Sequence, residues 1–453
     1  MVHFAIGDGN RYDTDRKPNM KRAMFALAAG LMLPCAAIPQ DLPPGVLLLS
    51  RIQRHIRQEL ERLPDISCLE TVRREHKEPN GKLRPLDTVR LEVLSTGNQE
   101  LFASPGDRKF SDRPPISFAG SGALGDGFFG LYLKSVLLNN NATHVYKGEE
   151  EIAGRRLARW DYRLPVMWSG QTIQLPEGAG RVGLRGAFWA DPQTLDVVRL
   201  ELNADDFPPT LPLTEAVWSI DYARTALEGH TAVLLPRSGG FRMAGFSGEL
   251  NTNAIEFTQC RVFAAESAIR FNDPGAVPDT PAFGTASVDE TLRPLPAGLK
   301  IAVRLRTRIS AGMAVGELIE GTVESNVQPK GALLIAAGSP VRGRIRRLER
   351  DTDPIPHYVV GLEFTEVEVQ GIRHRFHAEL TGVDSAPGVE LRLTVTTRTE
   401  EVNPAQGPGQ VRTTTEVLTL PDLPGVGTFF VKGRDLDLPP GFRTEWKTRA
   451  PER

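Results

Sequence analysis

Residues 186–202 read GAFWADPQTLDVVRLEL, and this stretch predicts two β-strands joined by a tight turn. Asp191-Pro192 supplies the turn, because Asp favours the first turn position and the fixed φ of Pro suits the second. Side chains alternate between the two faces of a strand. On the return strand we expect one face to carry Val198, Leu200 and Leu202, and the other Val197, Arg199 and Glu201. One face is therefore predicted to be buried and the other exposed to solvent.

The first strand of this hairpin presents aromatic bulk on both faces, through Phe188 and Trp189. An aromatic strand, an Asp-Pro-x-Thr turn and a return strand with Arg199-Leu200 resemble the hairpin of the Lol-type (lipoprotein-localisation) carriers. The chain is more closely similar to a group of exported, uncharacterised acidobacterial-type proteins built on the same half-barrel. Ordered landmarks carry this resemblance over roughly 46–271: residues 63–72, 160–165, 186–202, 207–213, 220–222 and 234–236.

Length and composition favour a globular protein of two to three domains, since the chain has 453 residues, 40% apolar and 24% charged. The net charge of −2 gives no general attraction to nucleic acid or to an anionic membrane, so neither is expected as a partner. The chain holds 43 Gly and 35 Pro, which favours many turns and short strands over long helices.

The first 37 residues have the pattern of a signal peptide. Basic residues precede a 15-residue apolar run, and small residues at Cys35 and Ala37 allow cleavage after Ala37. The run is shorter than the roughly 20 residues of a membrane-spanning helix. Met20 offers an alternative start, and a lipoprotein signal at Cys35 fits poorly because Pro34 precedes it. We expect export to the periplasm, with association to the outer membrane left open and at most a peripheral contact with the membrane.

Export makes the cysteines informative, because removal of Cys35 leaves only Cys68 and Cys260. Secreted compartments favour disulfides, so we expect these two to pair; the alternative is two unrelated buried thiols. The bridge would join the beginning and the end of the first domain.

Two helices are expected in that domain. Residues 46–63 place Ile52, Ile56 and Leu60 on one face, and Pro64 ends the helix. Residues 120–138 contain a G-x-G-x-x-G match, but the flanking segments read as antiparallel hairpins, so a dinucleotide site is not expected. We predict instead a glycine-rich lead into a helix that plugs the open side of a curved sheet. One side of it is expected to carry Phe128, Leu131, Tyr132, Ser135 and Leu138.

The predicted domain order is a signal peptide at 1–37, a half-barrel domain at 38–271, a Pro-rich linker at 272–297 and a β-barrel-like domain at 298–449. The first domain is α+β, a curved antiparallel sheet with two helices, and the second is all-β. Residues 329–331 and 337–345 resemble the glycine-rich core of barrel domains in conjugative and type IV secretion channel proteins. The channel helix of that family is absent. An Arg-rich run at 342–350 is expected to be a solvent-facing strand rather than a site for an acidic polymer.

Residues for catalysis, metal binding or cofactor binding are not indicated. Histidines 374 and 377 would lie on opposite faces of a strand, and neither a G-x-S-x-G elbow nor a phosphate-binding loop occurs. The resemblance to Lol-type carriers implies a non-enzymatic protein that binds an acyl chain, a lipid or a lipoprotein segment. The candidate ligand-binding residues are Phe128, Tyr132, Trp168, Trp189 and Trp218, with plain core packing as the alternative for each. The alternative function is a structural or assembly module that holds protein partners of the envelope.

Overall fold

The computed structural model describes residues 43–97, 99–107, 109–120, 122–175, 178–263, 292–352, 355–401, 410–417 and 423–450. The predicted signal peptide at 1–37 and most of the predicted linker, 272–291, lie outside these residues. The end of the linker does not, because Arg293–Pro294 forms a short strand, β13. Among the described residues, no helix is both long and apolar enough to cross a membrane.

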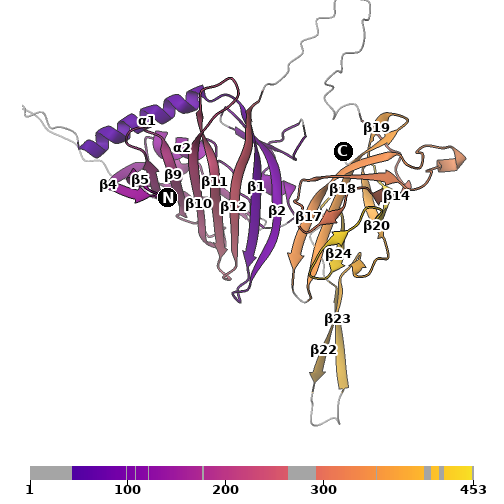
Figure 1. The fold of residues 1–453 in the computed structure, drawn as a ribbon. Helices are drawn as coiled ribbons and strands as arrows, with labels where there is room; N and C mark the ends of the chain where they lie inside the picture. Colours follow the sequence, from indigo (N-terminus) through magenta and orange to yellow (C-terminus); the bar gives the residue numbers. More distant parts are fainter. Residues whose placement is uncertain are drawn as a thin grey trace, which may run out of the picture. The chain divides into compact units, whose positions relative to one another are not determined.

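A ten-stranded antiparallel sheet forms the curled half-barrel (Figure 1), which confirms the fold expected for the first half of the chain. The strand order is β3-β2-β1-β12-β11-β10-β9-β8-β5-β4. Its strands are β1 Ile66–Lys77, β2 Leu83–Thr96, β3 Gln99–Ala103, β4 Thr143–Ile152, β5 Arg155–Leu164, β8 Gly183–Ala190, β9 Val197–Asp205, β10 Leu213–Thr225, β11 Val233–Gly245 and β12 Leu250–Val262. Consecutive strands pair as hairpins except where β1 meets β12 and β5 meets β8.

The hairpin predicted at 186–202 is β8 and β9, and its six-residue loop is held by the Asp191 carboxylate, which accepts the backbone N–H groups of Gln193 and Thr194. A β-bulge shifts the register next to Ala190 and Val197. Because of this bulge, Val197 lies in the main core with Leu200, whereas Val198 packs on the other face. The predicted faces of these two valines were therefore wrong.

The helix predicted at 46–63 is α1, Pro44–Arg62, which crosses one end of the half-barrel (Figure 1) and buries Ile52 and Ile56. The second predicted helix is much shorter. It consists of α2, Leu131–Leu133, and a π-helical turn, η2, Lys134–Leu138. The wider turn changes the helical phase. As a result, Leu131 is 47% exposed while Val136 and Leu137 are buried, so the predicted apolar side was wrong for Leu131.

Three short elements complete the first half of the chain. They are the 3₁₀ turn η1 Pro115–Phe118, the helix α3 Val166–Ser169 and the small hairpin of β6 Thr172–Leu175 and β7 Gly178–Arg181. The disulfide between Cys68 and Cys260 is present, as predicted, and joins β1 to β12 across 192 residues of sequence.

The second half of the chain forms another sheet, with the order β13-β19-β18-β17-β16-β14-β26-β20, and β24 also pairs with β18 and β21. Its strands are β14 Lys300–Leu305, β16 Leu318–Val323, β17 Pro340–Asp351, β18 His357–Val369, β19 Ile372–Arg375, β20 Ala378–Val383, β21 Val389–Glu390, β24 Gly427–Lys432 and β26 Arg443–Thr448. A 3₁₀ turn, η3 Pro329–Gly331, and a two-stranded pair of β15 Ile309–Ser310 and β25 Asp437–Leu438 accompany it. Barrel closure stays a prediction.

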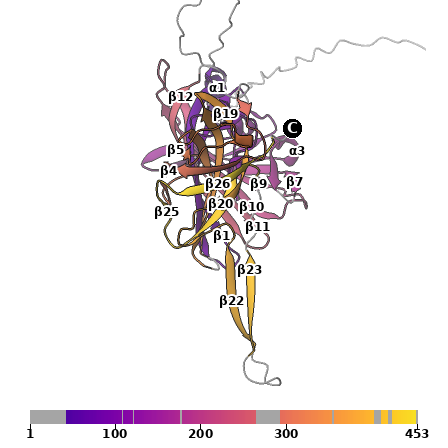
Figure 2. The same ribbon diagram turned by 90° about the vertical axis from the view of Figure 1, so that its right-hand side faces the viewer.

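The hairpin of β22 Thr394–Glu401 and β23 Gln410–Val417 pairs only with itself within the described part of the chain. It extends away from the second sheet in both ribbon views (Figures 1 and 2).

Backbone hydrogen bonds connect β2 to the loop before β16. Arg90 N donates to Val315 O at 2.9 Å, and Val315 N donates to Thr88 O at 2.8 Å. The side chain of Arg344, on β17, donates to the carbonyl oxygens of Pro105 and Gly316 at 2.8 and 2.9 Å.

The Arg-rich run of β17 is therefore not uniformly solvent-facing. Arg344 is 8% exposed and Arg347 is 1% exposed, and Arg347 pairs with Glu349 on the same strand. The expectation of a solvent-facing strand was wrong for these two arginines, because carboxylates and backbone carbonyls inside the protein compensate their charge.

Candidate functional site

The concave face of the half-barrel is occupied by the chain's own residues 122–138, here named the insert segment. Most of this segment is not helical, so its backbone groups need partners from elsewhere. Asn253 Nδ2 donates to Ala123 O at 2.8 Å, and the Tyr222 hydroxyl donates to Phe128 O at 3.0 Å. Both side chains belong to the sheet, so the sheet itself holds the insert segment.

The opposite side of the insert segment is held by two further side chains. Gln53, from α1, donates to Leu137 O at 2.9 Å, and the His144 ring donates to Val136 O at 2.9 Å. Burial lowers the pKa of His144, which keeps its ring neutral at neutral pH. The π-helical turn is thus fixed from both α1 and β4.

Glu100, on β3, is the acceptor at the tightest part of the insert segment. Its two carboxylate oxygens accept the backbone N–H groups of Gly127 and Phe129 at 2.7 and 2.8 Å. Gly127 has a φ of 89°, which favours glycine at that position. The positive φ of Gly127 thus lets the backbone turn so that the N–H groups of Gly127 and Phe129 both point toward the Glu100 carboxylate.

A cavity of about 220 Å³ opens beside this contact, between the end of α1, the β2–β3 turn and the insert segment. Its lining residues are Leu60, Glu61, Leu63, Pro64, Ser95, Gly97, Gln99, Glu100, Asp126, Gly127, Gly130, Leu131 and Lys134. Leucines form one part of the wall and carboxyl groups form another. Ligand pockets usually measure about 300–1,000 Å³, so this cavity suits one end of a ligand.

Three carboxyl groups near the cavity have raised pKa values. Burial raises the pKa of Glu100 to about 7, against the two N–H donors that lower it, and Asp126 raises it further. Burial also raises the pKa of Asp126, which opens onto the cavity. Glu70, on β1, is 2% exposed; burial and then the charges of Glu100 and Asp126 raise its pKa well above the usual value. Groups with such shifts often mark functional sites.

Three of the five predicted ligand-binding residues lie together in the core of the half-barrel. The ring centroids of Phe128 and Tyr132 are 6.3 Å apart, and those of Tyr132 and Trp218 are 6.0 Å apart. All three side chains are at most 4% exposed, and none lines the cavity directly. The indole N–H of Trp218 is buried without a hydrogen-bond partner in the described part of the structure.

The other two predicted residues lie elsewhere. Trp189 is on the outer face of β8, where its N–H donates to Glu150 at 2.9 Å and the Arg159 guanidinium lies 5.2 Å from its ring centroid. Trp168 belongs to α3 and is 52% exposed. The inner aromatic residue of β8 is Phe188, whose ring stacks on Trp160. The structure does not bring Trp168 or Trp189 to the other three residues.

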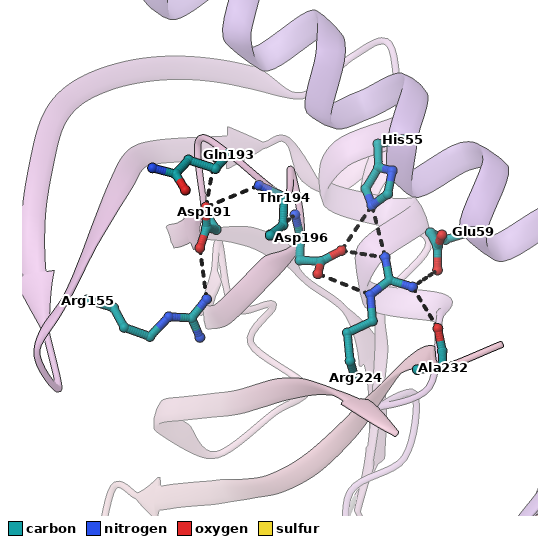
Figure 3. A network of polar contacts seen from close by, with 9 residues as sticks. All are labelled: His55, Glu59, Arg155, Asp191, Gln193, Thr194, Asp196, Arg224 and Ala232. Carbon is teal, nitrogen blue, oxygen red and sulfur yellow. Dashed lines mark hydrogen bonds and ion pairs between the residues drawn. The ribbon is translucent and has the colours of Figure 1, made fainter. Parts of the chain in front are cut away.

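A second polar cluster fastens α1 to the sheet (Figure 3). The Arg224 guanidinium contacts Asp196 at 2.6 Å and Glu59, from α1, at 2.6 Å, and it also donates to Ala232 O. His55 Nε2 lies 2.9 Å from Asp196 Oδ1. Although burial opposes the effect, hydrogen bonds from Arg224 and His55 hold the pKa of Asp196 below its usual value. This cluster links α1 to the end of β10 and to the loop before β9.

Glu70 and Glu100 were not singled out from the sequence. A signal for Glu70 was present, because it falls on the same strand face as Cys68 and Val72, which are apolar and buried. A charge inside an apolar alternation indicates a buried polar contact or a site. Glu100 carries no such signal, since its contacts come from residues 27 and 29 positions away. In the described part of the chain, no three acidic, histidine or cysteine side chains are arranged to hold a metal ion.

The solved structures that the chain matches include the following three, all of low sequence identity. A DUF1329 family protein from Desulfovibrio piger is 13% identical, with 49% of this chain and 94% of that chain covered and a TM-score of 0.25. A putative outer membrane lipoprotein-sorting protein domain from Vibrio parahaemolyticus is 12% identical, with 51% and 96% covered and a TM-score of 0.25. A LolA superfamily protein from Nitrosomonas europaea is 10% identical, with 47% and 94% covered and a TM-score of 0.22.

No family model matches the chain, and no curated protein matches it. The low TM-scores of the three structures support no argument about function.

Proposed function

We propose that this protein is a non-enzymatic binding protein of the cell envelope, exported to the periplasm, that holds the apolar end of a lipid or of a lipidated protein. The cavity beside the insert segment carries this proposal. It lies at an end of the half-barrel, and leucines from α1 and α2 form part of its wall.

The proposed binding mode begins at the cavity wall. Leu60 comes from the last turn of α1, Leu63 follows that helix directly, and Leu131 comes from α2. Leu131 is 47% exposed, so an apolar ligand would remove it from water. Burial of a leucine side chain contributes about 1.5–3 kcal/mol toward holding an acyl end.

A longer chain would have to displace the packed aromatic side chains of Phe128, Tyr132 and Trp218. Phe128 and Tyr132 flank or adjoin the cavity residues Gly127 and Leu131 along the chain. We propose that a shift of the insert segment would extend the cavity toward Phe128, Tyr132 and Trp218. We propose these three as the inner binding residues.

Native mass spectrometry of the chain from residue 38, purified from a bacterial periplasm, tests the proposal together with extraction of bound lipid. We expect one acyl species per chain, or uptake of one added 1-dodecanol. Leu131→Asp should weaken dodecanol binding by about tenfold or more, because it places a charge in the apolar wall. Leu83→Asp is the matched control, since Leu83 is 58% exposed and lies outside the cavity lining.

The proposal fails if the purified protein carries no lipid and takes up neither dodecanol nor fatty acid. Equal loss of binding in Leu131→Asp and Leu83→Asp would also contradict it, because the cavity would then have no special part. In either case the alternative of an envelope scaffold would remain.

A further inference from the structure

We propose that the outward side of α1 is a docking surface for an anionic phospholipid membrane, which contacts exposed arginines and exposed apolar residues of that helix together. The surface consists of Val46, Leu47, Arg51, Arg54 and Arg57, here named the α1 face. This inference goes beyond the proposed function, because it names the surface that meets the membrane and does not require the cavity to hold a lipid.

The fold of α1 places these residues on one side of the helix. Leu47, Arg51 and Arg54 are spaced by four and three residues, so they share a face. Ile52 and Ile56 point toward the sheet and are fully buried. All five residues of the α1 face are exposed, and α1 lies at the outside of the half-barrel (Figure 1). The α1 face is about 15 Å long, since each helical residue adds about 1.5 Å.

The arginines of the α1 face differ from most other arginines of the described structure, because no carboxylate pairs with them. Within the described part of the chain, their side chains have no hydrogen-bond or ion-pair partner. Exposure alone does not explain this difference. Arg73 pairs with Glu256 although their side chains are 61% and 52% exposed, and Arg156 pairs with Glu149 although its side chain is 82% exposed. The α1 face therefore carries positive charge that the described protein does not balance.

Attraction to an anionic membrane has to come from one face of the molecule, because the net charge of −2 gives no general attraction. Residues 44–58 contain no acidic residue. Of the two acidic residues that follow in α1, Glu59 pairs with Arg224 of the sheet and Glu61 lines the cavity. The first three-quarters of the helix thus present only positive charge to a surface within the Debye length of about 10 Å at 0.1 M salt.

The apolar residues of the α1 face favour a membrane over a soluble acidic protein. Val46 and Leu47 are 48% and 50% exposed, at the same end of α1 as the 40% exposed Tyr146, whose ring lies against Gly45. Helices that bind at a membrane surface combine basic side chains with apolar ones that enter the boundary between headgroups and acyl chains. Guanidinium groups match phosphate oxygens in geometry, and Tyr is common at such boundaries. The α1 face has all of these components.

Vesicle flotation of the full chain from residue 38 tests the inference. One set of vesicles contains phosphatidylcholine alone, and the other contains equal parts of phosphatidylcholine and phosphatidylglycerol. Each arginine near an anionic surface strengthens binding by about fivefold, so we expect about a hundredfold tighter binding to the anionic vesicles in about 0.1 M NaCl. In about 1 M NaCl the Debye length falls to about 3 Å, and this preference should be lost.

Replacement of the three arginines should remove the preference. The variant Arg51→Gln/Arg54→Gln/Arg57→Gln should bind the anionic vesicles about thirtyfold to a hundredfold more weakly than the original protein. Gln is a good helix former, and the three side chains have no partner in the described structure, so α1 should remain folded. Far-ultraviolet circular dichroism and urea denaturation check this.

The matched control removes the same charge from the half-barrel sheet. Arg73, Arg156 and Arg242 lie on β1, β5 and β11, and their side chains are 61%, 82% and 52% exposed. Exposed ion pairs of this kind contribute little to stability, so Arg73→Gln/Arg156→Gln/Arg242→Gln should fold normally. It should bind the anionic vesicles within about threefold of the original protein, because these arginines lie outside the α1 face.

A fluorescent label gives a second measurement that does not depend on the arginine variant. Leu47→Cys, labelled with an environment-sensitive dye, should show a blue shift on the anionic vesicles, because the dye enters the apolar boundary. Leu83→Cys with the same dye is the control, since Leu83 is 58% exposed and lies on β2. It should show no shift.

The inference is overturned by equal binding to the two kinds of vesicle, by binding to neither, or by equal losses in the two triple variants. Polyglutamate supplies the alternative of a soluble acidic partner. Binding to polyglutamate as tight as to the anionic vesicles, without a blue shift of the Leu47→Cys label, also overturns the inference.

Uptake of 1-dodecanol separates this inference from the proposed function. The Arg51→Gln/Arg54→Gln/Arg57→Gln variant should keep its dodecanol affinity within about twofold, because none of the three arginines lines the cavity. Loss of vesicle binding alone leaves the proposed function standing, and loss of dodecanol uptake alone leaves the membrane surface standing.

Discussion

At the scale of single residues, two opposed effects act on the pKa of Glu100: burial raises it and the two backbone hydrogen bonds lower it. Its carboxylate holds the insert segment through two backbone N–H groups, and burial raises its pKa to about 7. The same burial acts on Glu70 and Asp126. The half-barrel thus contains several carboxyl groups that are more easily protonated in the folded state than in the unfolded chain.

This arrangement predicts a pH dependence of stability. Unfolded Glu loses its proton near pH 4.5, whereas folded Glu100 loses it near pH 7. Between these values the folded state binds more protons, so the free energy of unfolding should fall as the pH rises from about 4.5 to 7. Glu100 should contribute about 2 to 3 kcal/mol to that fall, since one pKa unit corresponds to about 1.4 kcal/mol and the group is half-buried.

Urea denaturation at several pH values between 4.5 and 8 measures this dependence. Glu100→Gln should flatten the curve even if it changes the stability at a single pH, and Glu256→Gln should leave the slope unchanged. A slope of the same size in Glu100→Gln and the original protein would contradict the assignment to Glu100.

At the scale of elements, α1 depends on the cluster drawn in Figure 3. Arg224 contacts residues of α1 and of the loop before β9, and its hydrogen bond with Asp196, together with that of Glu59, raises its own pKa. Asp196 has only 12% of its side chain exposed. Removal of Arg224 would leave a partly buried carboxylate with the His55 ring as its remaining side-chain partner.

Arg224→Ala should therefore lower the free energy of unfolding by about 1–3 kcal/mol and increase hydrogen exchange in α1. Arg199→Ala is a matched control, because both side chains are 34% exposed and both pair with carboxylates. The partners of Arg199 are more exposed, so its loss should cost about 1 kcal/mol or less. Equal effects of the two variants would show that the cluster has no special role in holding α1.

Some of these elements could be predicted from the sequence and others could not. The apolar spacing of Ile52 and Ile56 predicted α1 because a regular helix repeats every 3.6 residues. The same rule failed for Leu131, because the short helix α2 passes into a π-helical turn at Lys134. Val197 and Val198 were assigned to the wrong faces because a bulge depends on the partner strand, which the local sequence does not show. The site was missed for a similar reason, since Glu70, Glu100 and Asp126 meet only through the fold.

At the scale of the whole molecule, the disulfide joins β1, the first strand of the half-barrel sheet in sequence, to β12, the last one. Cys68 lies on β1 and Cys260 on β12, and β1 and β12 also pair along most of their length. The bridge closes a loop of nearly the whole first half of the chain. A disulfide that closes a long loop lowers the conformational entropy of the unfolded chain, and this stabilises the folded state.

The double variant Cys68→Ser/Cys260→Ser should have a free energy of unfolding lower by about 4 kcal/mol than that of the oxidised protein. Reduction of the original protein with a thiol should give a similar decrease, and the reduced double variant should not change further. Thermal unfolding with and without reductant measures all three. The prediction is contradicted if the oxidised protein and the double variant unfold at the same temperature.

The pairing of β1 with β12 also sets the order in which the half-barrel is completed. β1 can pair with β2 soon after both have been synthesised, but its other side has no partner until residues 250–262 are present. Contacts between residues so distant in sequence form slowly, because a long loop must close first. Meanwhile the apolar inner face of β1 and β2 is open to other chains. We therefore expect the refolding rate, more than the final stability, to be sensitive to substitutions along the β1–β12 pair.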